Sequence, residues 1–188
     1  MANTNVAFGL KPINTAGSAP ATQGTNAYFI DSAASAIFQG SMVKADNGGE
    51  IVICSASGDT EAPVGVFAGC EYVSSTTGKK VFSNYWPGSG ADTNFDIIGF
   101  VHDNPLQRFI IATDATITNK ATAVAAIFEN SQFNNGASGS TTTGISSAQL
   151  DVATLDSSNA SLPLKIVGIL DDVENQDFAA AGIPMIVM

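Results

Sequence analysis

The stretch between Ala62 and Gly88 constrains the fold of this chain more than any other part of it. It contains two short apolar runs, residues 64–72 and 79–83, which are separated by a polar turn at residues 74–78. Both runs are rich in strand-forming residues such as Val, Phe and Tyr. Two such runs joined by a turn are typical of neighbouring β-strands, so the stretch predicts a β fold.

Strand-like runs recur about every 10 to 15 residues along the rest of the chain, with Gly, Asn, Asp and Ser between them. This pattern predicts a mainly β fold, an antiparallel barrel or sandwich of tulip-like or jelly-roll-like form. The expected strands are Tyr28–Ile30, Ile37–Lys44 (interrupted at Gly40), Ile51–Cys54, Val64–Tyr72, Lys79–Ser83, Phe95–Val101, Arg108–Ala112, Leu164–Leu170 and Ile183–Met188.

One segment departs from the strand pattern. Residues 120–129 are rich in Ala, which favours helix, and they predict a single short helix of two to three turns. Helical spacing would place Val124, Ile127 and Phe128 on one face of it.

Residues 1–27 differ in composition from the rest of the chain. They are small and polar and carry a single charge, at Lys11, while Phe8 and Leu10 are isolated apolar residues among them. Pro12 disfavours helix at this point. We therefore predict an extended N-terminal arm over residues 1–27 that is attached by Phe8 and Leu10; the alternative is a frayed terminus.

The remaining residues, 28–188, are expected to form one β domain, because 188 residues suit one domain with or without an arm. Within it, residues 131–147 are rich in Gly, Ser and Thr. They predict a flexible loop that is either mobile or held by a neighbour.

The composition restricts the classes of partner. Charged residues make up only 13% of the chain, about half the usual share. Small polar residues must then cover much of the surface, which is common where a protein lies against other subunits. The formal net charge is −10, and the seven cationic residues are dispersed. This excludes a basic stripe for nucleic acid, and the negative field opposes an anionic membrane.

No targeting or membrane signal stands out. The first residues have neither the cationic start nor the apolar stretch of a signal peptide, and no apolar run approaches the ~20 residues of a membrane span. Cys54 and Cys70 are the only cysteines. A disulfide between them is possible in principle, but reduced thiols in the core are the favoured interpretation.

The chain contains only partial matches to catalytic and metal-binding patterns. His102 and Asp103 are adjacent, but neighbouring residues on a strand point to opposite faces, and the chain has no Gly-x-Ser-x-Gly turn. Residues 92–96 begin like a calcium loop, but Ile97 stands where that loop needs Gly. The acidic residues of 171–177 suggest a solvated loop more than a divalent cation site. We expect no enzyme activity, no cofactor and no metal.

Tyr85 and Trp86 form an aromatic pair beside the turn Pro87-Gly88. Aromatic side chains beside a turn can bind sugars or a partner chain. Packing in the core or at a subunit interface is the favoured interpretation of this pair.

Several blocks in the same order resemble a family of small structural proteins of short-tailed bacteriophages, which is similar to capsid decoration, or cement, proteins. The resemblance extends over nearly the whole chain. The blocks are Ala2–Asn5 with Phe8–Pro12, Phe38–Lys44, Val64–Gly69 with Val81–Gly88, and Pro163–Gly168.

The resemblance implies a virion protein on the exterior of the phage head, made in the host cytoplasm. Such proteins often form trimers and bridge neighbouring subunits of the major capsid protein. The candidate partner-binding residues are Phe8, Leu10, Lys11 and Pro12 in the arm and, secondarily, Tyr85 and Trp86.

Two alternatives remain open. The first is a tail- or fibre-associated virion protein involved in host recognition, with Tyr85, Trp86 and residues 131–147 as its binding surface. The second is a β-barrel hydrolase whose catalytic groups, among them Asp103 or the acids of 171–177, are shared across subunits.

Overall fold

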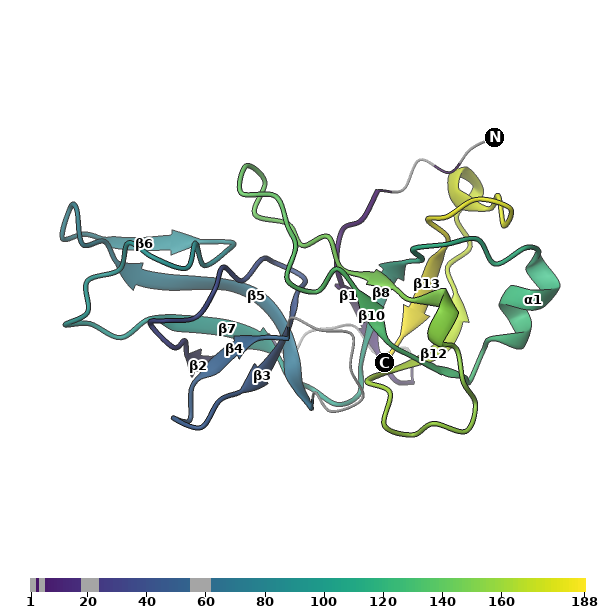
Figure 1. Ribbon diagram of the computed structural model, residues 1–188, viewed down its shortest axis with the longest axis horizontal. Helices are drawn as coiled ribbons and strands as arrows, with labels where there is room; N and C mark the ends of the chain where they lie inside the picture. Colours follow the sequence, from purple (N-terminus) through teal and green to yellow (C-terminus); the bar gives the residue numbers. More distant parts are fainter. Residues whose placement is uncertain (1–2, 4–5, 18–23, 55–61) are drawn as a thin grey trace.

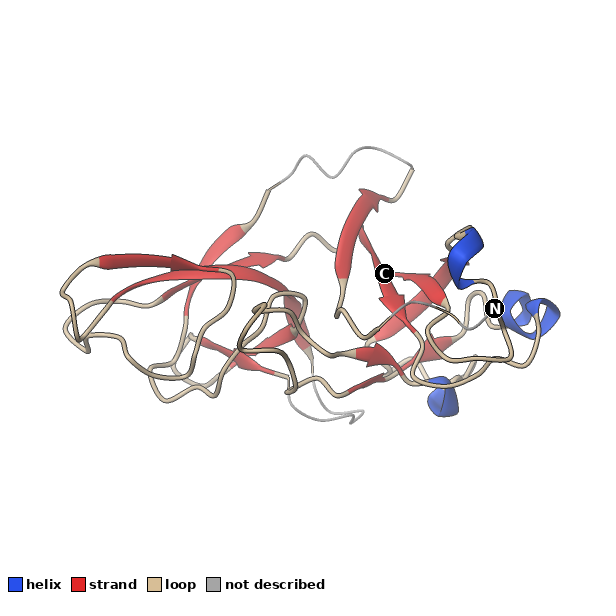
Figure 2. Cartoon of the chain, turned by 90° about the horizontal axis from the view of Figure 1, so that it is seen from above, coloured by secondary structure: helices blue, strands red, loops and turns tan. Residues whose placement is uncertain are grey.

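The computed structural model describes residue 3 and residues 6–17, 24–54 and 62–188. They form an elongated molecule of two β lobes that lie side by side, with the single α-helix at one end (Figures 1 and 2). The strands pair antiparallel, which confirms the predicted mainly β class. Within the described part of the chain no sheet closes into a barrel, so a sandwich-like arrangement fits better than a barrel.

The first lobe is built on one sheet in the order β2-β7-β5-β3-β4. The predicted pair of strands between Ala62 and Gly88 is confirmed: β5 pairs with β6, from Cys70 opposite Ser83 to Val73 opposite Lys80. An isolated parallel bridge links Ile30, just after β2, to Ile51 of β4, without closing the sheet. The strands are β2 (Asn26–Phe29), β3 (Met42–Ala45), β4 (Ile51–Ile53), β5 (Pro63–Val73), β6 (Lys80–Ser83) and β7 (Ile98–His102).

The second lobe is built on a sheet in the order β1-β8-β13-β12-β9, with a separate short pair, β10 and β11. The chain ends in this sheet, because β13 pairs with both β8 and β12. The elements are β1 (Lys11–Thr15), β8 (Gln107–Ala112), α1 (Lys120–Ala125), β9 (Asn130–Ser131), β10 (Phe133–Asn134), β11 (Gln149–Leu150), the 3-10 helices η1 (Val152–Thr154) and η2 (Val173–Asn175), β12 (Leu164–Ile169) and β13 (Pro184–Val187).

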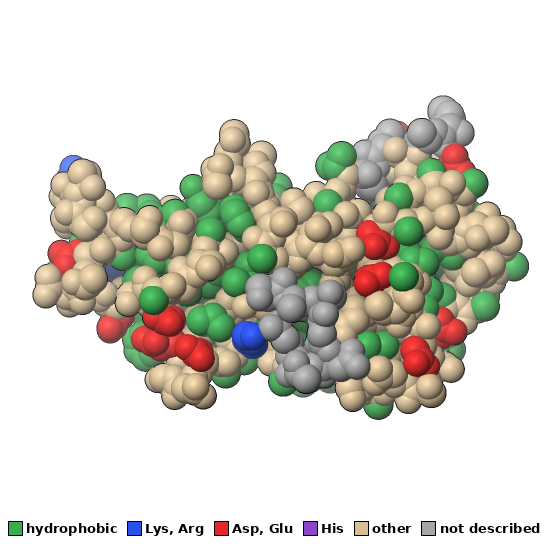
Figure 3. All heavy atoms as spheres, in the orientation of Figure 1, with side chains coloured by type: hydrophobic (Ala, Val, Ile, Leu, Met, Phe, Trp, Pro, Cys, Tyr) green, Lys and Arg blue, Asp and Glu red, His purple; other side chains and the backbone are tan. Residues whose placement is uncertain are grey.

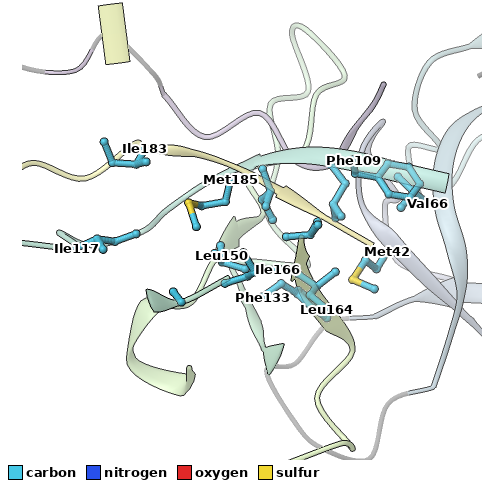
Figure 4. Close-up of a cluster of buried hydrophobic side chains, with 14 of the residues drawn as sticks. Met42, Val66, Phe109, Ile117, Phe133, Leu150, Leu164, Ile166, Ile183 and Met185 are labelled. Atoms are coloured by element: carbon cyan, nitrogen blue, oxygen red, sulfur yellow. The ribbon is translucent and has the colours of Figure 1, made fainter. Parts of the chain in front are cut away.

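Each lobe has an apolar core, and the core of the second lobe reaches into the first. Figure 4 shows that Met42 of β3 and Val66 of β5 lie in the same cluster as Phe109 and Leu164. These side chains are at most 7% exposed. Burying apolar surface in a common cluster stabilises the contact between the lobes.

Part of the predicted N-terminal arm is a strand of the second lobe. Lys11 lies opposite Ile110 and Pro12 opposite Phe109, so β1 forms the edge of the sheet beside β8. Leu10 is buried in the core of this lobe. Residues 10–15 of the 1–27 segment therefore belong to the folded body. Burial of the Leu10 side chain in this core removes apolar surface from water and so stabilises this position of the segment. Residues 18–23 lie outside the described residues.

The short helix predicted within residues 120–129 is confirmed, and it ends earlier than the predicted segment. Asn119 caps α1 by accepting a hydrogen bond from the Thr122 backbone N–H at 3.0 Å. Ala123 and Ala126 face the core, whereas Val124 and Phe128 are 50% and 70% exposed. The helix ends before Phe128, so helical spacing no longer decides where that side chain lies.

The segment 131–147 makes hydrogen bonds and packing contacts with residues of both lobes. Ser131 ends β9, Phe133 and Asn134 form β10, and the rest makes a hairpin between the lobes (Figure 1). The Gln39 backbone N–H donates to the Gly144 carbonyl, and the Ser146 N–H donates to the Gln39 carbonyl, both at 2.9 Å. The ring of Phe38 fills the space beside Gly139.

The two cysteines are buried thiols, as the favoured interpretation predicted. Cys54 lies in the core of the second lobe and Cys70 in that of the first, and no disulfide joins them. Burial raises the pKa of the Cys70 thiol to about 12.

Candidate partner-binding groove

The four predicted contact residues in the N-terminal segment line one hollow, which we call the β1 groove. Its volume is about 480 Å³. Residues from distant parts of the chain complete it, so it is a product of the tertiary fold. The lining consists of Phe8, Leu10, Lys11, Pro12, Gln39, Gly40, Ile110, Ile145, Leu170, Asp172 and Pro184.

Two glycines fix the path of the chain at the groove. Gly9 and Gly40 have φ angles of +70° and +87°, in the left-handed region that other residues avoid. The Leu10 N–H donates to the Gly40 carbonyl at 2.9 Å, and the Gly40 N–H donates to the Phe67 carbonyl at 2.8 Å. A Cβ atom at Gly9 would lie 2.7 Å from the Gly40 carbonyl oxygen. Because both positions are glycine, the backbone at Gly9 and Leu10 can lie directly against the backbone at Gly40.

The groove is mainly apolar. Leu10 is buried, Phe8 and Ile110 are half-buried, and Ile145 on the hairpin is 39% exposed. Leu170 is tied to β13 by a hydrogen bond from its N–H to the Pro184 carbonyl at 3.0 Å. Figure 3 shows hydrophobic side chains at the surface on both lobes and at their junction. An apolar hollow with a half-exposed rim suits an apolar side chain of another molecule.

One cation and one anion line the groove. Lys11 is exposed and has no ion-pair partner among the described residues. Asp172 caps η2: its carboxylate accepts from the Glu174 N–H at 3.1 Å and from the Asn175 side-chain amide at 2.7 Å. These bonds hold the Asp172 carboxylate in place, whereas Lys11 is exposed to solvent. The groove therefore offers apolar walls with both signs of charge.

The pair Tyr85–Trp86 is separate from the groove, because neither residue lines it. Trp86 is 1% exposed, its indole N–H donates to the Ala34 carbonyl at 3.2 Å, and Tyr72 packs against it edge to face at 5.3 Å. Tyr85 stacks on Phe38 at 5.7 Å. Trp86 is thus a core residue, as the favoured interpretation of this pair predicted.

His102 and Asp103 make unrelated contacts. His102 packs against Phe109 at 6.4 Å. The Asp103 carboxylate accepts from the Asn26 amide at 2.9 and 3.0 Å and from the Tyr28 hydroxyl at 2.5 Å. The bonds from Asn26 and Tyr28 hold the pKa of Asp103 below its ordinary value. The same bond to Asp103, together with burial, raises the pKa of Tyr28.

The acidic segments serve as turns. Asp92 accepts from the Asn94 backbone N–H at 3.0 Å and from the Asn94 side-chain amide at 2.8 Å. Asp171 accepts from the Gln176 amide, and Asp177 donates its backbone N–H to Asn3 at 2.9 Å. Among the described residues no three His, Cys, Asp or Glu side chains are grouped to hold a metal ion.

None of the helices in the described part of the chain has the length and apolar composition needed to cross a membrane.

The sequence predicted the residues that the N-terminal segment contributes to the groove, but not the residues contributed by the rest of the chain. Ile110, Leu170 and Pro184 lie on or beside strands of one sheet, and Ile145 lies on the hairpin. Each is an ordinary apolar residue of its own segment, so no local pattern marks it as part of a site. Only the pairing of β8 with both β1 and β13 brings these residues together with Phe8.

Comparison with known protein families, with curated proteins and with solved structures gives no significant match.

Proposed function

We propose that this chain is a structural, partner-binding protein that decorates a bacteriophage capsid. In this proposal it attaches to the major capsid protein on the exterior of the head through the β1 groove. The single observation that carries the proposal is the groove itself, an apolar hollow of about 480 Å³ with residues Phe8–Pro12 on one side.

The chemistry of the groove favours binding over catalysis. Among the described residues, its lining includes no Ser, Thr, Cys or His, so it offers no hydroxyl, thiol or imidazole, and its titratable side chains are Lys11 and Asp172. Apolar walls flanked by Lys11 and Asp172 match an extended protein segment that carries an apolar side chain between polar ones.

The virion assignment is supported by the sequence blocks that resemble decoration proteins and by the low share of charged residues, 13%. Phe8–Pro12 belongs to the first of those blocks and lines the groove. A surface with few charges suits a protein that lies against other subunits. Many weak contacts on one shell add up to firm attachment, so each groove needs only moderate affinity.

Attachment is tested with purified capsid shells that lack this protein, using variants that keep the fold. Removal of residues 1–25 would be uninformative, because it removes Leu10 and β1 from the body. Ile145→Asp places a charge at the exposed rim of the groove. We expect it to weaken binding to the shells by about tenfold or more, because an unpaired charge would be held against the apolar surface of the partner.

The matched control is Phe82→Asp, which places the same charge at a 71% exposed side chain on β6, away from the groove. This variant should bind as the unaltered protein does. Circular dichroism of both variants must show the native spectrum. If Ile145→Asp binds the shells as well as Phe82→Asp, the groove is not the attachment site.

A separate measurement tests the location on the particle. A stained gel of purified virions should show this chain in a fixed, high ratio to the major capsid protein. A ratio of only a few copies per particle would instead indicate the tail- or fibre-associated alternative.

A further inference from the structure

A second hollow lies in the first lobe and shares no lining residue with the β1 groove. Its volume is about 220 Å³. The Ile30 N–H donates to the Ile97 carbonyl at 2.9 Å, and Ile30 bridges to Ile51. These contacts bring together the neighbours of those residues in the chain, Phe29, Glu50, Phe95 and Asp96, all of which line the hollow. We call it the phenyl–carboxylate pocket.

Two half-exposed aromatic rings belong to this pocket. Phe29 and Phe95 are 50% and 56% exposed, although Ile30 and Ile97 beside them are buried in the core of the lobe. A phenyl ring left half in water contributes only part of the stabilisation it would give when buried. Its exposed face is available to a flat or cationic group.

The charges of the pocket are all of one sign. Neither Glu50 nor Asp96 takes part in an ion pair within the described residues, and no Lys, Arg or His lines the pocket. The hydroxyls of Ser32, Ser89 and Thr93 supply further hydrogen-bond acceptors. An anionic ligand is therefore disfavoured, and the net charge of −10 adds to the attraction for a cation.

We propose that the phenyl–carboxylate pocket binds the guanidinium group of an arginine side chain on a partner protein. A guanidinium stacks on aromatic faces and donates to carboxylates in the plane of its fork, so it uses both kinds of group that this pocket presents. A neutral sugar would use the rings and hydroxyls but would gain little from two carboxylates without cationic partners. The inference does not depend on the proposed function.

The test is an NMR titration of the whole protein with N-acetyl-arginine amide, a method suited to weak binding. We expect chemical-shift changes at residues 29–32, 50 and 89–97, and we expect them to shrink as salt is added. N-acetyl-glutamine amide, which lacks the charge, and methyl glucoside should leave these signals unchanged. The inference fails if the arginine probe moves no signals there or if the sugar moves them instead.

Variants separate the roles of the rings and the carboxylates. Phe95→Leu should weaken binding of the arginine probe by roughly two- to fivefold through loss of one cation–π contact. Glu50→Gln and Asp96→Asn should each weaken it by a similar factor of roughly two to five. Unchanged affinity in all three would overturn the proposal.

Controls of matching chemistry lie elsewhere on the surface. Glu174→Gln removes the same unit of charge at an exposed position on η2, and Phe82→Leu removes an exposed ring on β6. Both should retain the affinity of the unaltered protein. Ile145→Asp in the β1 groove should also bind the probe normally, so failure of this site and failure of the proposed attachment site are distinguishable.

Discussion

The Asp103 carboxylate shows how a single residue can join two strands. It follows β7 and accepts hydrogen bonds from Asn26 and Tyr28 of β2. Because these bonds favour the charged form, the pKa of Asp103 lies below its value in the unfolded chain, which is about 3.9. The stabilisation is therefore complete above that unfolded value and is lost as the pH falls through the lower pKa of the folded state.

The lowered pKa of Asp103 predicts how the stability of a variant depends on pH. Asp103→Asn should lower the urea midpoint of unfolding at pH 6, where the native carboxylate is charged. The difference between variant and unaltered protein should begin to narrow as the pH falls below 3.9 and should vanish once the pH is below the lower folded-state pKa of Asp103, where both side chains are neutral. A difference that stays constant between pH 6 and pH 2.5 would contradict the assigned role of the charge.

Cys70 allows a second residue-scale prediction. Burial raises its pKa to about 12, so almost none of it is thiolate at pH 8. The folded protein should react with Ellman's reagent only slowly at this pH, and both cysteines should react at once in urea. Rapid reaction of one thiol in the folded state would show that Cys54 or Cys70 is accessible, contrary to their burial.

At the scale of the elements, the close packing of β5 against β7 requires a glycine at position 65. A Cβ atom at Gly65 would lie 2.3 Å from the His102 carbonyl oxygen and 2.8 Å from Cγ1 of Val101. Gly65→Ala must then push the two strands apart, at a cost of about 1 to 3 kcal/mol in the free energy of unfolding. Urea denaturation measures this difference.

The control for this prediction is Gly168→Ala in β12. There the added Cβ would lie 3.7 Å from Cδ1 of Ile186, an ordinary contact. This substitution should change the free energy of unfolding by less than about 1 kcal/mol, in either direction. Equal losses of stability in the two variants would show that close approach of the strands at Gly65 is not the cause.

The elements also show which parts of the structure are predictable from local sequence. The β5–β6 hairpin and the single helix follow from composition and turns within a few residues. The expected grouping of Val124, Ile127 and Phe128 on one helical face does not hold, because α1 ends at Ala125, before Ile127 and Phe128. Ala123 and Ala126 pack inward instead. Pairing of β1 with β8 is a contact between distant segments, and no local pattern specifies it.

The same distinction holds for the candidate site. Phe8 and Leu10 were noticed because they are isolated apolar residues in a polar segment, and both line the β1 groove. Trp86 was expected to pack in the core or at a subunit interface, and it is a core residue. The other residues of the groove could not be named from the sequence, because burial depends on which distant segments pack nearby.

At the scale of the whole molecule, the two lobes share a core. Met42 and Val66 come from the sheet of the first lobe but pack in the cluster of the second. Separating the lobes would expose these side chains to water. The lobes are therefore coupled in stability, and the β1 groove, lined by segments next to this junction, is held at a fixed shape.

This coupling predicts a single unfolding transition. Trp86 is the only tryptophan of the chain and reports on the first lobe, whereas circular dichroism reports on all strands. The two signals should follow the same curve in urea. Met42→Ala should lower the free energy of unfolding by about 2 to 5 kcal/mol, and both signals should move to lower urea concentration together. Two separate transitions would contradict the shared core.

The central claim is that the β1 groove contacts the major capsid protein, and site-specific crosslinking on assembled particles tests it most directly. A photoreactive benzoylphenylalanine in place of Ile145, at the rim of the groove, should crosslink this chain to the major capsid protein on irradiation. The same group in place of Phe82 on β6 should not. Crosslinks from position 82 but none from position 145, or crosslinks from 145 to a tail protein only, would contradict the account.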